Sequence, residues 1–204
     1  RFVGIGGHGG YPHTGRDPIV AAAEAVLNLQ QIASREIDPT EPVVVTVGTI
    51  QAGTAVNVIP DSATIAGTVR TLDEQPRRLA QEAMRRRLAG IATAHGCKLE
   101  FEWTDGYPPT VNDPAMCDYV AEVVRGAMGE GRFVPVGRPS MGGEDFAYYA
   151  QKVPACFFFT GVEPLDCERY PSLHTDRYDY TDSALGVAMR VFVELAMRWK
   201  ANQG

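Results

Sequence analysis

The side chains best suited to chemistry lie in a few loop-like stretches, of which the first is Gly/His-rich and covers residues 6–15. Glycines flank His8 on both sides, and His13 follows five residues later, beyond a proline. Glycines let backbone and substrate approach closely, and an imidazole there can donate a hydrogen bond to a developing oxyanion. Two histidines could also share a metal ion, but this spacing across a proline is not typical of metal ligands. A structural hydrogen bond is the simpler alternative for either ring.

Three further sites carry polar side chains with chemical potential. Asn57 and Arg70 are candidate binders of an anionic group, because a guanidinium can grip a carboxylate through two hydrogen bonds. His174 lies in a predicted loop between a Phe-rich strand and the last helix, where α/β folds often place their sites. The Gly142–Asp145 loop is acidic and precedes a helical turn. Each also has a structural explanation: an Asn turn, a solvated strand arginine, an incidental loop histidine and a helix cap.

A glycine pattern near the start suggests another class of site, which the residues after it argue against. Gly4, Gly6 and Gly9 have the spacing of a dinucleotide-binding fingerprint. That motif needs a helix to open at its last glycine, so that pyrophosphate meets the helix N-terminus. Here Pro12 follows and the helix begins only at Pro18, so we do not expect nucleotide binding.

The elements that position these residues follow from hydrophobic periodicity. Asp17 and Pro18 provide a helix N-cap and first-turn proline. Strands and helices are predicted in alternation: strand 2–5, helix 18–34, strands 43–47 and 63–71, a helix ending near His95, and strand 98–103. This β-α-β-β-α-β order predicts an α/β fold of the ferredoxin-like type, with a four-stranded antiparallel sheet and both helices on one side.

After a linker at 107–109, the pattern predicts less sheet. Helices are expected at 114–128 and from residue 181 or 182, with short strands at 133–136 and 153–160. The last helix carries an apolar stripe that we expect to be packed: Leu185, Ala188, Met189, Phe192, Ala196 and Met197. Two strands and two helices are too little for a separate core, so we expect the tail of a larger domain. The apolar start without Met likewise suggests a fragment of a longer polypeptide.

Composition excludes several classes of protein. The chain has 204 residues, 45% of them hydrophobic, and a net charge of −6, which argues against disorder and against nucleic acid as the main partner. No apolar run approaches the ~20 residues that span a bilayer, so no membrane partner is expected. The four cysteines form no Cys-x-x-Cys pair, and we expect reduced thiols in a cytoplasmic protein.

Taken in order, the motifs resemble a known family. They are Gly7-His8-Gly9-Gly10-Tyr11-Pro12-His13, Asp17-Pro18-Ile19, Asn57-Val58-Ile59-Pro60, Gly67-Thr68-Val69-Arg70, Met141-Gly142-Gly143-Glu144-Asp145-Phe146 and Leu173-His174. Each is weak alone, but the ordered set is similar to the amidohydrolase branch of the M20 metallopeptidases. This branch includes hippurate hydrolases, N-acyl-amino-acid amidohydrolases and auxin-conjugate hydrolases, and the resemblance covers essentially the whole chain.

The resemblance implies two domains and a role for each candidate residue. Residues 1–105 would form a dimerisation (lid) domain, and residues 106–204 the C-terminal portion of a zinc-peptidase-like α/β catalytic domain. His8 would reach the partner subunit's site and stabilise the tetrahedral intermediate, while Asn57 and Arg70 would bind the substrate's carboxylate, also in trans. His174 would be a metal ligand and should face a cleft. The loop containing Gly143 and Glu144 would line the pocket near the metals.

The implied activity is cleavage of the amide bond of small N-acyl amino acids, hippurate-like or acetylated, by a homodimer joined through residues 1–105. The implied cofactors are two divalent metal ions, zinc or else manganese, cobalt or nickel. The sequence departs from the family's pattern because it lacks the Cys-x-His motif, the Glu-Glu pair and a further histidine that members carry upstream of the lid. The alternative is a non-catalytic dimerisation and ligand-binding module, if the 204 residues are complete.

Overall fold

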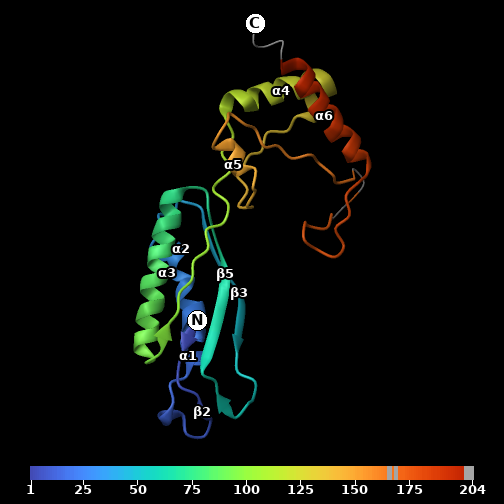
Figure 1. The fold of residues 1–204 in the computed structure, drawn as a ribbon. Coiled ribbons are helices and arrows are strands. Elements are labelled where there is room, and N and C mark those ends of the chain that lie inside the picture. Colours follow the sequence, from blue (N-terminus) through green and yellow to red (C-terminus); the bar gives the residue numbers. More distant parts are fainter. Residues whose placement is uncertain (165–166, 168–169, 200–204) are drawn as a thin grey trace. The chain divides into compact units, whose positions relative to one another are not determined.

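The structure, a computed structural model, describes residues 1–164, 167 and 170–199. It divides into two compact units (Figure 1). Unit 1 contains Arg1–Pro109 and Pro139–Glu144, and unit 2 contains Thr110–Arg138 together with the residues from Asp145 onward. The predicted domain boundary at 105/106 stays a prediction.

Unit 1 is built on a four-stranded antiparallel sheet in the order β3-β5-β1-β6. Its strands are β1 (Phe2–Val3), β3 (Val43–Ala52), β5 (Ser62–Thr71) and β6 (Lys98–Leu99). The helices are α1 (Pro18–Leu29), α2 (Gln31–Arg35) and α3 (Glu74–Ala94). Figure 1 shows the helices on one side of the sheet. The predicted ferredoxin-like βαββαβ arrangement is confirmed.

The core of unit 1 lies between this sheet and α1 and α3. Phe2 is 1% exposed, and Leu29 and Ile32 are also fully buried. The period-two pattern explains the sheet's contribution, because Ala63, Ile65 and Val69 alternate toward the helices. Burying these apolar side chains is the main stabilising term of the unit.

Two elements differ from the predicted boundaries. The helix expected over 18–34 is divided at Gln30 into α1 and α2, although Asp17 caps it as predicted by accepting a hydrogen bond from the N–H of Ile19. The strand expected over 98–103 ends at Leu99. Its neighbour β1 pairs only with Lys98 and Leu99, so residues 100–103 have no strand beside them.

A second, two-stranded sheet positions the Gly/His-rich loop. Strand β2 (Gly7–His8) pairs with β4 (Val58–Ile59), with His8 opposite Val58. A short 3-10 helix, Pro12–Thr14, follows β2. The loop after β1 is therefore tied to the segment that leads into β5.

Unit 2 is helical, and its described residues contain no strand. It consists of α4 (Pro114–Met128), a 3-10 turn (Glu130–Arg132), α5 (Ala147–Ala150) and α6 (Ser183–Trp199). The strands predicted at 133–136 and 153–160 are wrong: these apolar segments have no neighbouring strand with which to form a ladder. Instead, the side chain of Asn112 holds the N–H and the carbonyl of Phe157, each at 2.8 Å.

The helices of unit 2 pack on each other through few buried residues. The Tyr119 hydroxyl on α4 donates to the carbonyl of Leu195 on α6 at 2.6 Å. The apolar stripe predicted for the last helix exists but is not packed, because Leu185, Phe192 and Met197 are 58%, 62% and 77% exposed.

Within the described residues, no helix is both long and apolar enough to cross a membrane. The cytoplasmic location stays a prediction.

Candidate functional site

The structure shows which nitrogen of the neutral His8 ring carries the proton. Nδ1 accepts a hydrogen bond from the backbone N–H of Gly10 at 2.9 Å. A nitrogen that accepts a hydrogen bond carries no proton, so the neutral ring is protonated at Nε2. The side chain is exposed, and no described residue pairs with Nε2. His8 thus presents a single N–H donor to whatever approaches this loop.

Gly9 and Gly10 allow the backbone to lie close to the His8 ring and to Asn57. A Cβ at Gly10 would lie 3.2 Å from Nδ1 of His8, tighter than ordinary packing. The N–H of Gly9 donates to the carbonyl of Asn57 at 2.8 Å, and a Cβ at Gly9 would lie 3.0 Å from that oxygen. A side chain at either position would force the neighbouring backbone or imidazole to move by a few tenths of an ångström. The sequence analysis missed Gly10 as an orienting group, for which the doubled glycine after His8 was the available signal.

Asn57 lies beside this loop, so the structure brings His8 and Asn57 together. The pairing of β2 with β4 places His8 opposite Val58, the residue after Asn57. The Asn57 side chain is exposed, and no described residue pairs with it. An amide and an imidazole N–H therefore share one end of unit 1.

Arg70 lies elsewhere in unit 1, against the loop that contains Gly143. A Cβ at Gly143 would overlap Nη1 of Arg70, and Cδ2 of Tyr107 would lie 3.5 Å from it. Arg70 is exposed, and no carboxylate in the described part of the chain pairs with its guanidinium. This arrangement leaves the guanidinium able to bind an anion. Tyr107, which the sequence analysis treated only as part of a linker, belongs to the same group.

The structure does not bring Arg70 and Gly143 close to His8 and Asn57. β5 begins at Ser62, next to the small sheet, and Arg70 is its penultimate residue. At about 3.3 Å per residue, the strand separates the two ends by roughly 25 Å. One chain therefore cannot apply His8, Asn57 and Arg70 to one small substrate. The expectation that Asn57 and Arg70 act together does not fit within a single unit 1.

The structure places His174 at the surface of unit 2. It lies in a turn of unit 2 with a φ of 66°, and its side chain is exposed. A left-handed conformation is uncommon for a residue other than glycine. The described residues contain no group of three or more His, Cys, Asp or Glu side chains that could hold a metal ion. The role of His174 as a metal ligand therefore stays a prediction.

Glu144 is half-buried, and no hydrogen bond or ion pair of its side chain occurs among the described residues. It does not cap a helix, since α5 begins at Ala147 without a side-chain cap. Gly142 and Gly143 lie in the part of unit 1 that contains Arg70. The residues present do not by themselves form a two-metal centre.

The fold and these loops define a class of protein: a ferredoxin-like α/β unit that carries exposed polar side chains, joined to a second unit that is helical in its described residues. Residues 1–95 match the family of peptidase dimerisation domains found in M20 peptidases. The chain belongs to the M20 peptidase family.

Its relatives are hydrolases about twice its length. The N-acetylcysteine deacetylase of Bacillus subtilis is 38% identical over 194 residues, which cover 95% of this chain and 49% of that enzyme. The hippurate hydrolase of Campylobacter jejuni is 34% identical over 199 residues, 98% of this chain and 50% of the relative. The chain thus spans about half the length of the curated relatives it matches.

A solved structure agrees with these matches. The crystal structure of a dinuclear metal-binding M20 peptidase from Bacillus subtilis is 33% identical and has a TM-score of 0.69. The similarity covers 96% of this chain and 48% of that one. The predicted family and mixed α/β fold class are confirmed.

Proposed function

We propose that this chain is the lid and part of the catalytic domain of a metal-dependent amidohydrolase that cleaves the amide bond of N-acyl amino acids. The observation that carries the proposal is the hydrogen bond from Gly10 to Nδ1 of His8, which leaves Nε2–H as an exposed, oriented donor. The relatives' names support this reaction class, since they include a deacetylase of N-acetylcysteine and a hydrolase of hippurate.

His8 would act on the oxygen of the scissile amide. When a nucleophile adds to the carbonyl carbon, negative charge develops on that oxygen, and a pre-oriented N–H lowers the free energy of the transition state. The Gly10 hydrogen bond favours this role because it prevents the ring from presenting an acceptor nitrogen. Asn57 would add a second polar contact to the same substrate.

Arg70 would bind the free carboxylate of the amino-acid half through two parallel hydrogen bonds. Its contact with Gly143 suggests which subunit it serves. We assign Gly143 to the rim of the chain's own metal pocket, so Arg70 would serve that pocket, whereas His8 and Asn57 would serve the partner's. This assignment replaces the expectation that Arg70 also acts in trans.

This assignment of residues to two subunits requires a homodimer. The outer edge of the sheet in unit 1 supports one. β3 is ten residues long and forms the outer edge of the sheet. Its outer backbone groups have no partner strand in the described part of the chain, and such an edge readily pairs with a second copy. We propose dimerisation through residues 1–105.

Two divalent metal ions, zinc or else manganese, cobalt or nickel, would supply an activated water when bound. His174 is proposed as one ligand. The remaining ligands would have to come from residues outside the described part of this chain. Metal analysis of the full-length protein tests this: about two ions per subunit supports the enzyme, and none supports the non-catalytic module.

Replacing His8 tests the proposal directly. In the full-length dimer, His8→Ala should lower turnover of an N-acyl amino acid by about 10²–10³-fold, with unchanged metal content. His13→Ala is the matched control, because His13 is exposed in the same loop and contacts only the edge of the Tyr11 ring, at 6.5 Å between ring centroids. Equal turnover of the two variants would contradict the role of His8.

Mixing two inactive variants tests the assignment of subunits. If His8 serves the partner's site and Arg70 its own, a mixed dimer of His8→Ala and Arg70→Ala subunits has one intact site. Equal mixing should restore roughly a quarter of wild-type activity, because half of the dimers are mixed. If both residues act in trans, no site is intact and the mixture stays inactive.

A further inference from the structure

Two of the four cysteines lie side by side in unit 2. Cys117 lies in the first half of α4, and Cys156 lies in the apolar segment that follows α5. The Cys117 thiol donates a hydrogen bond to Sγ of Cys156, with 3.7 Å between the two sulfur atoms. Both side chains are partly exposed. The fold thus brings together two thiols that are 39 positions apart in the sequence.

Hydrogen bonds on both sides of the sulfur pair join the two segments that carry it. The N–H of Asp113 donates to the carbonyl of Ala155 at 2.8 Å. The Asn112 side chain donates to the carbonyl of Phe157 and accepts from its N–H, each at 2.8 Å. The N–H of Cys117 donates to the carbonyl of Asp113 at 2.9 Å. Because these bonds fix the backbone next to both cysteines, the two sulfur atoms stay neighbours while unit 2 is folded.

The other two cysteines lack such a neighbour. Among the described residues, no sulfur atom contacts that of Cys97 or Cys167. A disulfide bond needs a sulfur separation of about 2.05 Å, so Cys117 and Cys156 must close their gap by roughly 1.7 Å. Rotation about their Cα–Cβ bonds supplies a movement of this size without a shift of the backbone.

We propose that Cys117 and Cys156 form a redox-active dithiol site, which a low-molecular-weight disulfide oxidises to an intramolecular disulfide between α4 and the segment after α5. The Cys117 thiol loses its proton to water, and its sulfur attacks one sulfur of the oxidant, whose S–S bond breaks and releases a small thiolate. Cys156 then loses its proton, and its sulfur attacks Sγ of Cys117 and displaces the second small thiolate. Two electrons pass from the protein to the oxidant, and the two protons balance the two released thiolates.

The surroundings of Cys156 decide which thiol attacks first. The thiolate is the nucleophile in this exchange. Burial, together with the neighbouring Cys117, raises the pKa of the Cys156 thiol from 9.0 to about 12, so Cys156 stays protonated at neutral pH and the first attack falls to Cys117. Once the Cys117 sulfur is part of a mixed disulfide, it can no longer form a thiolate beside Cys156, which removes one cause of the raised pKa.

Peptide mapping tests the pairing. The chain is oxidised with glutathione disulfide, its remaining thiols are alkylated, and linked peptides are identified by mass spectrometry. Two of the four free thiols should disappear, and the linked peptides should contain Cys117 and Cys156. A control chain with both Cys97→Ser and Cys167→Ser should form the same bond. The absence of this bond, a bond to Cys97 or Cys167, or a bond between two copies overturns the proposal.

Two rate and equilibrium measurements test the role of the fold. The equilibrium constant for oxidation by glutathione disulfide should be at least about tenfold larger in the folded chain than in urea, because the fold holds the sulfur atoms together. Equal constants would mean that the thiols meet only by chance. Cys156→Ser should form a mixed disulfide at Cys117 at least about tenfold faster than Cys117→Ser forms one at Cys156. Equal rates overturn the order of attack.

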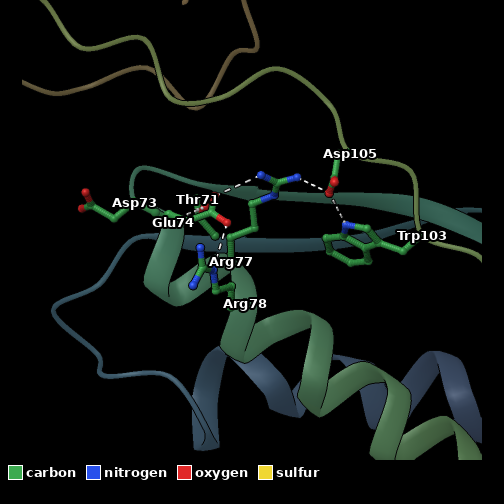
Figure 2. A network of polar contacts seen from close by, with 7 residues as sticks. All are labelled: Thr71, Asp73, Glu74, Arg77, Arg78, Trp103 and Asp105. Atoms are coloured by element: carbon green, nitrogen blue, oxygen red, sulfur yellow. Dashed lines mark hydrogen bonds and ion pairs between the residues drawn. The ribbon is translucent and has the colours of Figure 1, made fainter. Parts of the chain in front are cut away.

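Tryptophan fluorescence separates the effect on unit 2 from any effect on unit 1. Trp199 lies edge-on to Tyr119 of α4, with 5.3 Å between ring centroids. Figure 2 shows Trp103 in unit 1, where its indole donates to Asp105 at 2.8 Å. Oxidation should raise the urea midpoint read at Trp199, since a disulfide restricts the unfolded chain, and should leave the midpoint read at Trp103 unchanged. No rise at Trp199, or an equal rise at Trp103, overturns the proposal.

Discussion

The two units of this chain differ in how deeply their apolar side chains are buried. In unit 1, Phe2 is 1% exposed within a core that helices and sheet build together. In unit 2, Phe192 is 62% exposed on a helix with a clear apolar stripe. Helices in both units have an apolar face, but only unit 1 contains the surface on which that face packs.

This difference shows that an apolar stripe predicts a contact but not its partner. The α6 stripe has the correct helical period, and the two main helices of unit 2 do not cover it. The chain spans about half the length of its relatives, and we propose that the stripe packs on residues outside this chain.

Separation of the units should have the largest effect. Residues 1–109 should unfold cooperatively in urea, because all residues of the unit 1 core lie within them. Residues 110–204 should unfold at a much lower urea concentration and should bind an apolar dye, because their stripe is exposed. Trp103 and Trp199 report on one unit each. If monomeric 110–204 unfolded at the same urea concentration as 1–109, the two units would not differ in this way.

Matched phenylalanine substitutions should differ by several kcal/mol. Phe2→Ala should lower the free energy of unfolding of unit 1 by about 3–5 kcal/mol, because it leaves a buried cavity. Phe192→Ala should change the stability of unit 2 by less than about 1 kcal/mol, since its ring is mainly exposed. Urea titration in the full chain, read at the tryptophan of each unit, measures both. Similar losses would mean that α6 is already packed.

Glu36, which follows the last residue of α2 in unit 1, should contribute more to the free energy of unfolding than Glu194 does in unit 2. Glu36 pairs with Arg86 and Arg87, and the Glu36 and Arg87 side chains are only 19% and 16% exposed. Glu36→Gln should cost about 1.5–3 kcal/mol because it leaves the part-buried Arg87 guanidinium without its charged partner. In unit 2, Glu194→Gln removes a more exposed pair with Arg198 and should cost about 0.3–0.5 kcal/mol. Urea titrations of both variants in the full chain, read at the tryptophan of each unit, measure the two losses.

The pH dependence should be the smallest effect and should appear in unit 2. Burial, together with Cys117, raises the pKa of the Cys156 thiol from 9.0 to about 12. Folded unit 2 therefore disfavours the thiolate and loses stability as pH rises above 9.

Urea titrations at a series of pH values measure this effect. Cys156→Ser should remove the loss of stability in unit 2 above pH 9. A loss that persists in this variant would show that another group causes it.

Sequence reasoning succeeded where the relevant interactions are local. Asp17 caps α1 and Asp113 caps α4 through backbone N–H groups two or three residues away, and both caps are visible as Asp-Pro pairs. It failed for residues 153–160, whose apolar composition suits a strand but whose pairing partner must come from elsewhere in the chain. β6 is short for the same reason, because pairing depends on a neighbour and not on alternation alone.

The candidate site shows the same limit. The residue types, the order of elements, the capped helices and the family follow from the sequence alone, because they depend on near neighbours and on motif order. The three-dimensional arrangement was needed to show that His8 lies beside Asn57 while Arg70 lies against Gly143. Strand pairing brings together residues that are far apart in sequence, and no local pattern encodes which of them meet.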